Sequence, residues 1–148
     1  MFKVVIDTNV LISGLLKADT APRRLLELCI DGKVRPLMGN ALFSEYLDVL
    51  ARESLFSGCA VSAEEREVVL DAFLAACQWI NIYFRWRPNL RDEADNHLVE
   101  LAIAGNASHI VTGNNRDFTQ PNLTFPKLKI VSIRDFKTLL QEVAIWES

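Results

Sequence analysis

KVVIDTNVLIS, residues 3–13, is the stretch that decides how this chain begins to fold. Its β-branched run from Val4 to Ile6 is typical of a buried strand, and the run stops at Asp7. In open α/β sheets, ligands bind beyond the carboxyl ends of the strands. Asp7 is therefore either the first residue of a polar site or a turn former that ends the strand, since Asp is common in turns.

The size and composition of the chain are those of an ordinary globular domain. It has 148 residues, of which 50% are hydrophobic and 24% are charged. No linker or repeat divides them, so we expect one domain over residues 1–148. No apolar stretch approaches the roughly 20 residues of a membrane span, and no signal-type cleavage site is recognisable. We therefore expect no membrane partner.

The cysteines indicate the cellular compartment of the protein, and the net charge limits how it could bind nucleic acid. Cys29, Cys59 and Cys77 are scattered, which is neither a disulfide framework nor a zinc knuckle. This pattern fits a reducing compartment, so we expect a cytoplasmic protein. The net charge of −3 argues against bulk electrostatic attraction to nucleic acid. A nucleic-acid partner would have to be held by a local basic patch or by metal ions.

Apolar periodicity and turn residues predict strands that alternate with helices. After the first strand, further strands are expected at Val34–Met38, Trp79–Phe84, His109–Thr112 and Lys129–Val131. Helices are expected at Thr20–Ile30, Ala41–Arg52, from Ser62 through the apolar stripe to Ala76, Asp92 to about Gly105, and Ser132 to about Glu142. The alternation implies an α/β fold with right-handed crossovers and a parallel sheet covered on both faces.

Polar pairs fall at strand ends or helix starts. They are Asp7 with Asn9, Asp92 with Asp95, and Asn114 with Asp117. Strand ends and helix starts share one edge of a parallel sheet, so these side chains converge there. Converging carboxylates raise each other's pKa unless a cation lies among them, and oxygen ligands without His or Cys favour Mg²⁺ or Mn²⁺. Two such ions activate water and stabilise the leaving oxygen in phosphodiester cleavage.

Each of these acids also has a purely structural interpretation. Asp92 is suited to cap a helix, and Asp95 in a first turn is favoured by the helix dipole. Asp117 fits simple turn chemistry. Glu45, considered alone, is typical of a solvated helix face. His97 lacks the spacing of a metal ligand, and we interpret it as a packing or surface residue, as we do His109.

The basic loop around Trp86 has two interpretations. Arg85 and Arg87 flank this aromatic residue, a combination that stacks and pairs with single-stranded RNA. The alternative is a solvated loop with one buried aromatic side chain.

Three segments together resemble the PIN domain family. They are VIDTNVLIS at residues 5–13, NALFSEYL at residues 40–47, and RDEADNHLVELA at residues 91–102, followed by ASHIVTGN at residues 107–114. The resemblance runs from Val4 to about Leu140. The most similar subgroup comprises bacterial PIN proteins described as toxin components of toxin–antitoxin pairs.

The resemblance implies a metal-dependent endoribonuclease with a three-layer α/β/α sandwich, a Rossmann-like arrangement around a central parallel sheet. By position, the catalytic acids are Asp7, Glu45 and Asp95, which would also bind Mg²⁺ or Mn²⁺. The remaining implied site residues are the secondary metal ligands Asp92 and Asp117 and the supporting polar residues Asn9, Ser13, Thr112 and Asn114. Arg85, Arg87 and Arg116 are the expected RNA-binding residues. RNA is the implied substrate, with an antitoxin protein and a homodimer as further expected partners.

Asn114 departs from the family pattern. Many relatives have an aspartate directly after Thr-Gly, where this chain has asparagine. Asparagine still offers one carbonyl oxygen to a metal ion but brings no charge, so a second ion would bind weakly. Asp117 would compensate if its turn points inward.

Three classes of function compete. The first is an endoribonuclease, and the second is a weakened PIN scaffold that binds RNA or protein, which Asn114 favours. The third is a phosphotransfer or phosphatase domain. The haloacid-dehalogenase pattern needs a second Asp where Asn9 stands, and a receiver domain needs an acidic pair before its first helix. Neither is present, nor is a Gly-rich phosphate loop.

Overall fold

A parallel sheet forms the centre of the molecule. The computed structural model describes residues 1–82, 96–113 and 128–147. Within them, five strands pair in the order β3-β2-β1-β4-β5, and every pairing is parallel. The strands are β1 (Phe2–Ile6), β2 (Val34–Met38), β3 (Gln78–Trp79), β4 (His109–Val111) and β5 (Lys129–Val131). The first strand of the chain is therefore the middle strand, and all carboxyl ends share one edge.

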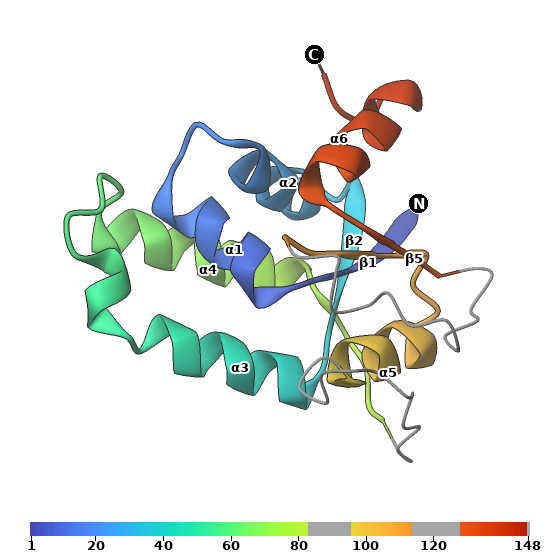
Figure 1. Ribbon diagram of the computed structural model, residues 1–148, viewed down its shortest axis with the longest axis horizontal. Coiled ribbons are helices and arrows are strands. Elements are labelled where there is room, and N and C mark those ends of the chain that lie inside the picture. Colours follow the sequence, from blue (N-terminus) through green and yellow to red (C-terminus); the bar gives the residue numbers. More distant parts are fainter. Residues whose placement is uncertain (83–95, 114–127, 148) are drawn as a thin grey trace.

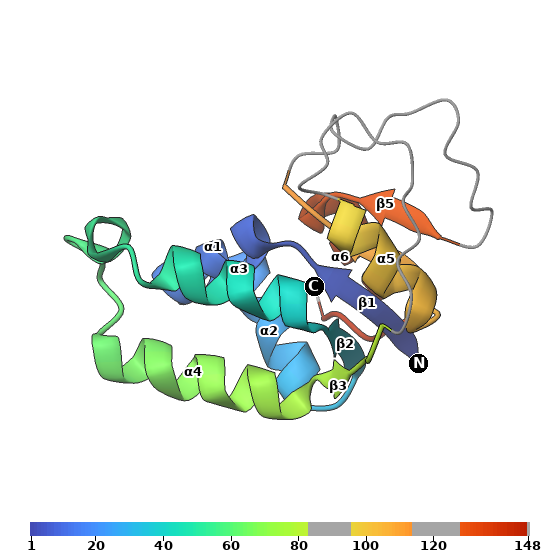
Figure 2. The same ribbon diagram turned by 90° about the horizontal axis from the view of Figure 1, so that it is seen from below.

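Helices cover both faces of this sheet, as Figures 1 and 2 show. They are α1 (Thr8–Leu16), α2 (Ala21–Ile30), α3 (Asn40–Leu50), α4 (Ala63–Ala76), α5 (Asn96–Ala104) and α6 (Ile133–Glu142), with a 3₁₀ turn at Glu53–Phe56. Helices α2 and α6 lie on one face of the sheet, and α5 lies on the other. Helix α3 contacts both α1 and α5. The predicted three-layer α/β/α architecture is confirmed.

Hydroxyl side chains begin three of the helices, as their sequence positions indicate. Thr20, Ser62 and Ser132 each accept a hydrogen bond from the backbone N–H three residues later. Such caps satisfy donors that have no partner inside the helix. The predicted starts of α2, α4 and α6 are therefore correct.

Helix α1 was not predicted, because its sequence has no amphipathic period. Six of its nine residues are buried, so it lacks the polar face that marks a surface helix. The strand expected at Trp79–Phe84 was also misplaced. Strand β3 covers only Gln78–Trp79, in register with Leu37 and Met38 of β2, and Ile80 to Ile82 are not strand.

Three smaller boundary differences remain. Helix α3 runs from Asn40 to Leu50 rather than from Ala41 to Arg52, and β4 ends at Val111. The expected helix start at Asp92 lies outside the described residues.

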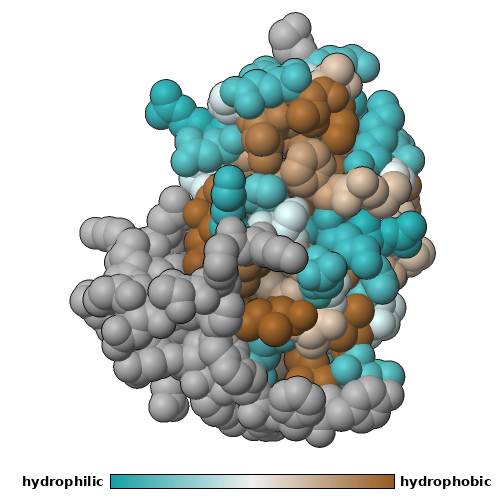
Figure 3. Space-filling model, turned by 90° about the vertical axis from the view of Figure 1, so that its right-hand side faces the viewer, coloured by the Kyte–Doolittle hydropathy of each residue, from teal (hydrophilic) through white to brown (hydrophobic). Residues whose placement is uncertain are grey.

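The surface carries apolar side chains on several separate elements. Figure 3 shows one face, where apolar patches lie between hydrophilic ones. The exposed large hydrophobic residues include Leu47, Val68, Trp79, Ile103 and Val143, which belong to different segments of the chain. Among the described residues, no helix has the length and apolarity that crossing a membrane requires.

Candidate functional site

Asp7 lies where the central strand ends and α1 begins. Its Oδ1 accepts a hydrogen bond from the Thr8 N–H at 2.7 Å, which caps the helix. Its Oδ2 accepts one from the Thr112 hydroxyl, also at 2.7 Å. The Asp7 N–H donates to the Val111 carbonyl at 2.9 Å and so extends the β1–β4 pairing. Both carboxylate oxygens and the backbone of Asp7 are therefore fixed in position.

The charge on Asp7 is nevertheless costly. Burial raises the pKa of Asp7 above its ordinary value, and the hydrogen bonds from Thr112 and Thr8 oppose that effect without cancelling it. The negative charge of Glu45 raises the pKa of Asp7 further. An acid that is partly buried, ordered and close to a second acid marks a candidate site rather than a simple turn.

Glu45 reaches this edge of the sheet because α3 is fixed against β1. The neighbouring Tyr46 is buried, and its hydroxyl donates a hydrogen bond to the carbonyl of Ile6, the residue before Asp7. This bond joins α3 to the end of the central strand. Two acids that are 38 positions apart in sequence thus act on each other, as the effect of Glu45 on the pKa of Asp7 shows.

The second side chain that acts on Glu45 is that of His97, on α5. Its Nε2 lies 3.0 Å from Glu45 Oε2. This polar contact lowers the pKa of Glu45 below its ordinary value, although burial opposes it. The effect of the Thr8 hydroxyl on the pKa of Glu45 has the same sign. The site is therefore formed by residues on or next to β1, α1, α3, β4 and α5.

The donor set suits a hard divalent cation. Asp7 and Glu45 supply carboxylate oxygens, and the buried Thr8 hydroxyl makes no hydrogen bond of ordinary geometry with any described residue. Clustered oxygen atoms of this kind bind Mg²⁺ or Mn²⁺ in preference to softer ions. Within residues 1–82, 96–113 and 128–147, no three His, Cys, Asp or Glu side chains form a group that could hold a metal ion.

Comparison with known proteins identifies the family. A model of the PIN domain matches residues 3–116. The chain belongs to the PIN domain family. Comparison with curated proteins found no match. Among solved structures, a chain of the crystal structure of VapBC2 from Rickettsia felis bound to a DNA fragment from their promoter is similar, with a TM-score of 0.58 and 19% identity. The similarity covers 88% of this chain and 98% of that chain, and it shows a common fold.

The predicted supporting residues of this PIN domain differ in whether they contact Asp7. Thr112 is fully buried and bonds directly to Asp7. Asn9 Oδ1 accepts a hydrogen bond from the Gly113 N–H at 3.2 Å, and a Cβ atom at position 113 would lie 3.3 Å from the Asn9 side chain. Ser13 is exposed and donates to the Asn9 carbonyl within α1. Thr112 is thus the supporting residue that contacts an acid.

The remaining predicted site residues lie outside the described residues. They are the acids Asp92, Asp95 and Asp117, the amide Asn114 and the basic residues Arg85, Arg87 and Arg116. Their roles stay predictions.

Sequence reasoning missed two residues of the site. His97 was interpreted as a packing or surface residue, yet it contacts Glu45. Its position two residues after Asp95 was the only available signal. Tyr46 was assigned to the apolar face of α3, which is correct, but its hydroxyl bond to Ile6 was not foreseen. The other histidine, His109, is a buried packing residue as expected.

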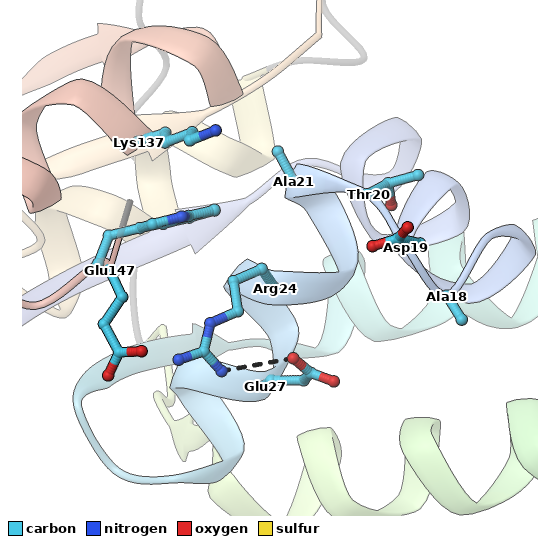
Figure 4. A pocket seen from close by; sticks show the side chains of 9 residues that line it. Ala18, Asp19, Thr20, Ala21, Arg24, Glu27, Lys137 and Glu147 are labelled. Carbon is cyan, nitrogen blue, oxygen red and sulfur yellow. Dashed lines mark hydrogen bonds and ion pairs between the residues drawn. The ribbon is translucent and has the colours of Figure 1, made fainter.

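A separate hollow of about 450 Å³ lies between α2, α6 and the C-terminal residues (Figure 4). Its lining includes the cations Arg24 and Lys137 and the acids Asp19, Glu27 and Glu147. Arg24 is already paired with Glu27 at 3.4 Å. None of Asp7, Glu45 and His97 lines this hollow, so it is distinct from the candidate site.

Proposed function

We propose that this PIN domain is a metal-dependent endoribonuclease that hydrolyses phosphodiester bonds of RNA. The observation that carries the proposal is the environment of Asp7. Its carboxylate is largely buried, both oxygens are fixed by Thr8 and Thr112, and Glu45 adds a second negative charge. A fold rarely retains such repulsion without a cation to offset it.

The metal ligands we assign are Asp7, Glu45 and Asp95, with Asp92 and Asp117 as secondary ligands. When bound, Mg²⁺ or Mn²⁺ would supply an activated water and would stabilise the charge on the leaving oxygen. The residues of the chain provide the geometry. Asp7 presents a carboxylate from the end of a rigid strand, and Thr112 fixes its orientation through the hydroxyl bond.

The proposed RNA contacts are local, because the net charge of −3 gives no general attraction to a polyanion. We assign RNA backbone contacts to Arg85 and Arg87, which belong to the predicted loop with Trp86, and to Arg116. Asn9 and Asn114 are the proposed polar neighbours of the scissile group.

The biological role we propose is that of a toxin component in a toxin–antitoxin pair, acting in the cytoplasm. The fold similarity to a chain of the VapBC2 complex supports this role. It also supports an antitoxin protein as a partner. A homodimer and a single domain over residues 1–148 belong to the same proposal.

A weakened PIN scaffold that binds RNA or protein is the second candidate. Asn114 favours it, because it replaces an acid that many relatives have. An Asn114→Asp variant should then gain metal affinity, whereas no gain would mean that residue 114 points away or that Asp117 already acts in its place.

The deciding test compares cleavage of single-stranded RNA by wild type and by Asp7→Asn, with Mg²⁺ or Mn²⁺ present. Asparagine is nearly isosteric and still caps a helix, so the variant should fold. Cleavage should fall by roughly 100-fold or more, the loss that follows removal of one preorganised electrostatic contact. In metal-free buffer, the same variant should melt at a higher temperature, because a buried charge is removed.

Asp48→Asn is the matched control, since it removes an exposed carboxylate from the helix that carries Glu45. It should cleave like wild type. Equal cleavage by wild type and Asp7→Asn would remove Asp7 from the catalytic machinery. No cleavage by either protein on a broad panel of RNAs would favour the binding scaffold.

A further inference from the structure

Glu45 needs an external constraint to serve as a ligand. Its side chain is 40% exposed, and it is longer than that of Asp7 by one rotatable bond. Asp7 repels it, since each negative charge disfavours the other. Without an opposing contact, the Glu45 carboxylate would be expected to turn toward solvent.

His97 provides that contact. Its side chain is 21% exposed, and Nε2 lies 3.0 Å from Glu45 Oε2. The other ring nitrogen, Nδ1, is buried and has no hydrogen-bond partner among the described residues. Glu45 Oε2 is also buried and accepts no hydrogen bond of ordinary geometry from the described residues. A carboxylate oxygen only accepts, so a favourable contact at 3.0 Å places the hydrogen of His97 on Nε2.

We propose that His97 is a positioning residue that holds the Glu45 carboxylate beside Asp7 in the orientation required for metal binding. This inference rests on the proposed function, because it assigns Glu45 to the metal. His97 acts through Glu45 and is not assigned as a ligand. Groups that hydrogen-bond to metal-binding side chains commonly matter for affinity by about 10–100-fold.

Two contacts hold the segment around Glu45 at this edge of the sheet. Tyr46 fixes α3 to the end of β1 through the Ile6 carbonyl, and His97 fixes the adjacent side chain from α5. Tyr46 thus fixes the backbone beside Glu45, and His97 contacts the carboxylate itself. A side chain that is constrained before binding loses less conformational freedom when a ligand binds.

A double-mutant cycle on the full chain tests the inference. Mn²⁺ binding to metal-free protein is measured by calorimetry for wild type, His97→Leu, Glu45→Gln and the double variant. We expect His97→Leu to weaken Mn²⁺ binding by about 10–100-fold in the wild-type background. It should have almost no further effect in the Glu45→Gln background, because its action passes through Glu45.

Two further variants separate positioning from folding. His97→Gln retains an N–H donor and should recover part of the lost Mn²⁺ affinity. His109→Gln alters the other histidine, which is buried away from Glu45, and should leave Mn²⁺ affinity unchanged. Melting curves without metal check that each variant is folded.

The outcomes distinguish this inference from the proposed function. If wild type binds Mn²⁺ but the effects of His97→Leu and Glu45→Gln add independently, His97 does not act through Glu45 and the inference is wrong. Unchanged Mn²⁺ affinity in a folded His97→Gln and a folded His97→Leu would have the same meaning. If wild type itself does not bind Mn²⁺, the metal-dependent function is wrong, and the inference with it.

Discussion

The two ends of the β1–β4 pair each hold an ionisable side chain, and its surroundings shift the pKa in opposite directions. At the carboxyl end, Asp7 is ionisable, largely buried and close to Glu45, so its pKa is raised. At the amino end, His109 packs against Phe2 and Phe136, with ring centroids 5.7 Å and 5.3 Å away. Burial lowers the pKa of His109 and so favours the neutral ring.

The comparison shows that one end of the β1–β4 pair serves packing and the other end holds the candidate site. At the His109 end, Lys129 is the strand partner of His109 and its charge also lowers the pKa of His109, while Ser108 Oγ lies 2.7 Å from His109 Nδ1. The Asp7 end keeps charges together although burial disfavours them. Only two positions along these strands separate the ends, since Val4 pairs with His109 and Ile6 pairs with Val111. The same two strands thus support an apolar core at one end and a candidate site at the other.

The largest expected effect is at the aromatic end. Phe136 is fully buried, so Phe136→Ala should lower the free energy of unfolding by about 3–5 kcal/mol through lost burial and a cavity. Urea unfolding measures the change, with exposed Val143→Ala as the control. A loss below about 1 kcal/mol would mean that this end is not a packed core. Any variant molecules that remain folded should keep their Mn²⁺ affinity.

A smaller effect is expected from Thr112→Val at the polar end. The variant keeps the shape of the side chain but leaves Asp7 Oδ2 without its donor, which should cost about 1–3 kcal/mol of unfolding free energy. The pKa of Asp7, followed by NMR titration, should rise further. Thr138→Val, which removes an exposed helical hydroxyl, is the control. An unchanged Asp7 pKa would show that the Thr112 bond does not stabilise the charge.

The smallest expected effect is the pH dependence of the unfolding free energy, to which the two ends should contribute with opposite signs. His109 has a folded pKa below its ordinary value of 6.5, so the unfolded chain binds the proton first as pH falls. Stability from His109 is therefore present above pH 6.5 and is lost as pH falls from there toward the folded pKa. Asp7 has a raised folded pKa, so its contribution improves as pH falls through that value toward 3.8.

Unfolding free energies between pH 7.5 and 5.5 test the His109 contribution. The difference between wild type and His109→Gln should shrink as pH falls, because the glutamine side chain does not titrate. A difference that is constant across this range would contradict the assigned pKa direction. Extending the series to about pH 4 with Asp7→Asn shows whether the polar end contributes with the opposite sign.

Local sequence was sufficient for much of the fold. The predicted limits of β2 and β5 agree with the structure, because each is a short run bounded by turn or cap residues. The caps at Thr20, Ser62 and Ser132 depend on contacts over three residues, which the sequence shows directly. The end of β1 at Asp7 is equally local, since the side chain bonds to the next backbone N–H.

Contacts between distant segments decided the rest. Helix α1 is buried on most sides, so burial by other elements, rather than an amphipathic pattern, marks it as a helix. The position of β3 follows from its pairing with β2, which a sequence pattern does not specify. The Glu45–His97 contact depends on how α3 and α5 pack at one edge of the sheet. The sequence by itself thus determined which residues carry charge at that edge, and only the tertiary structure decided which of them meet, because side-chain proximity across helices is a property of packing.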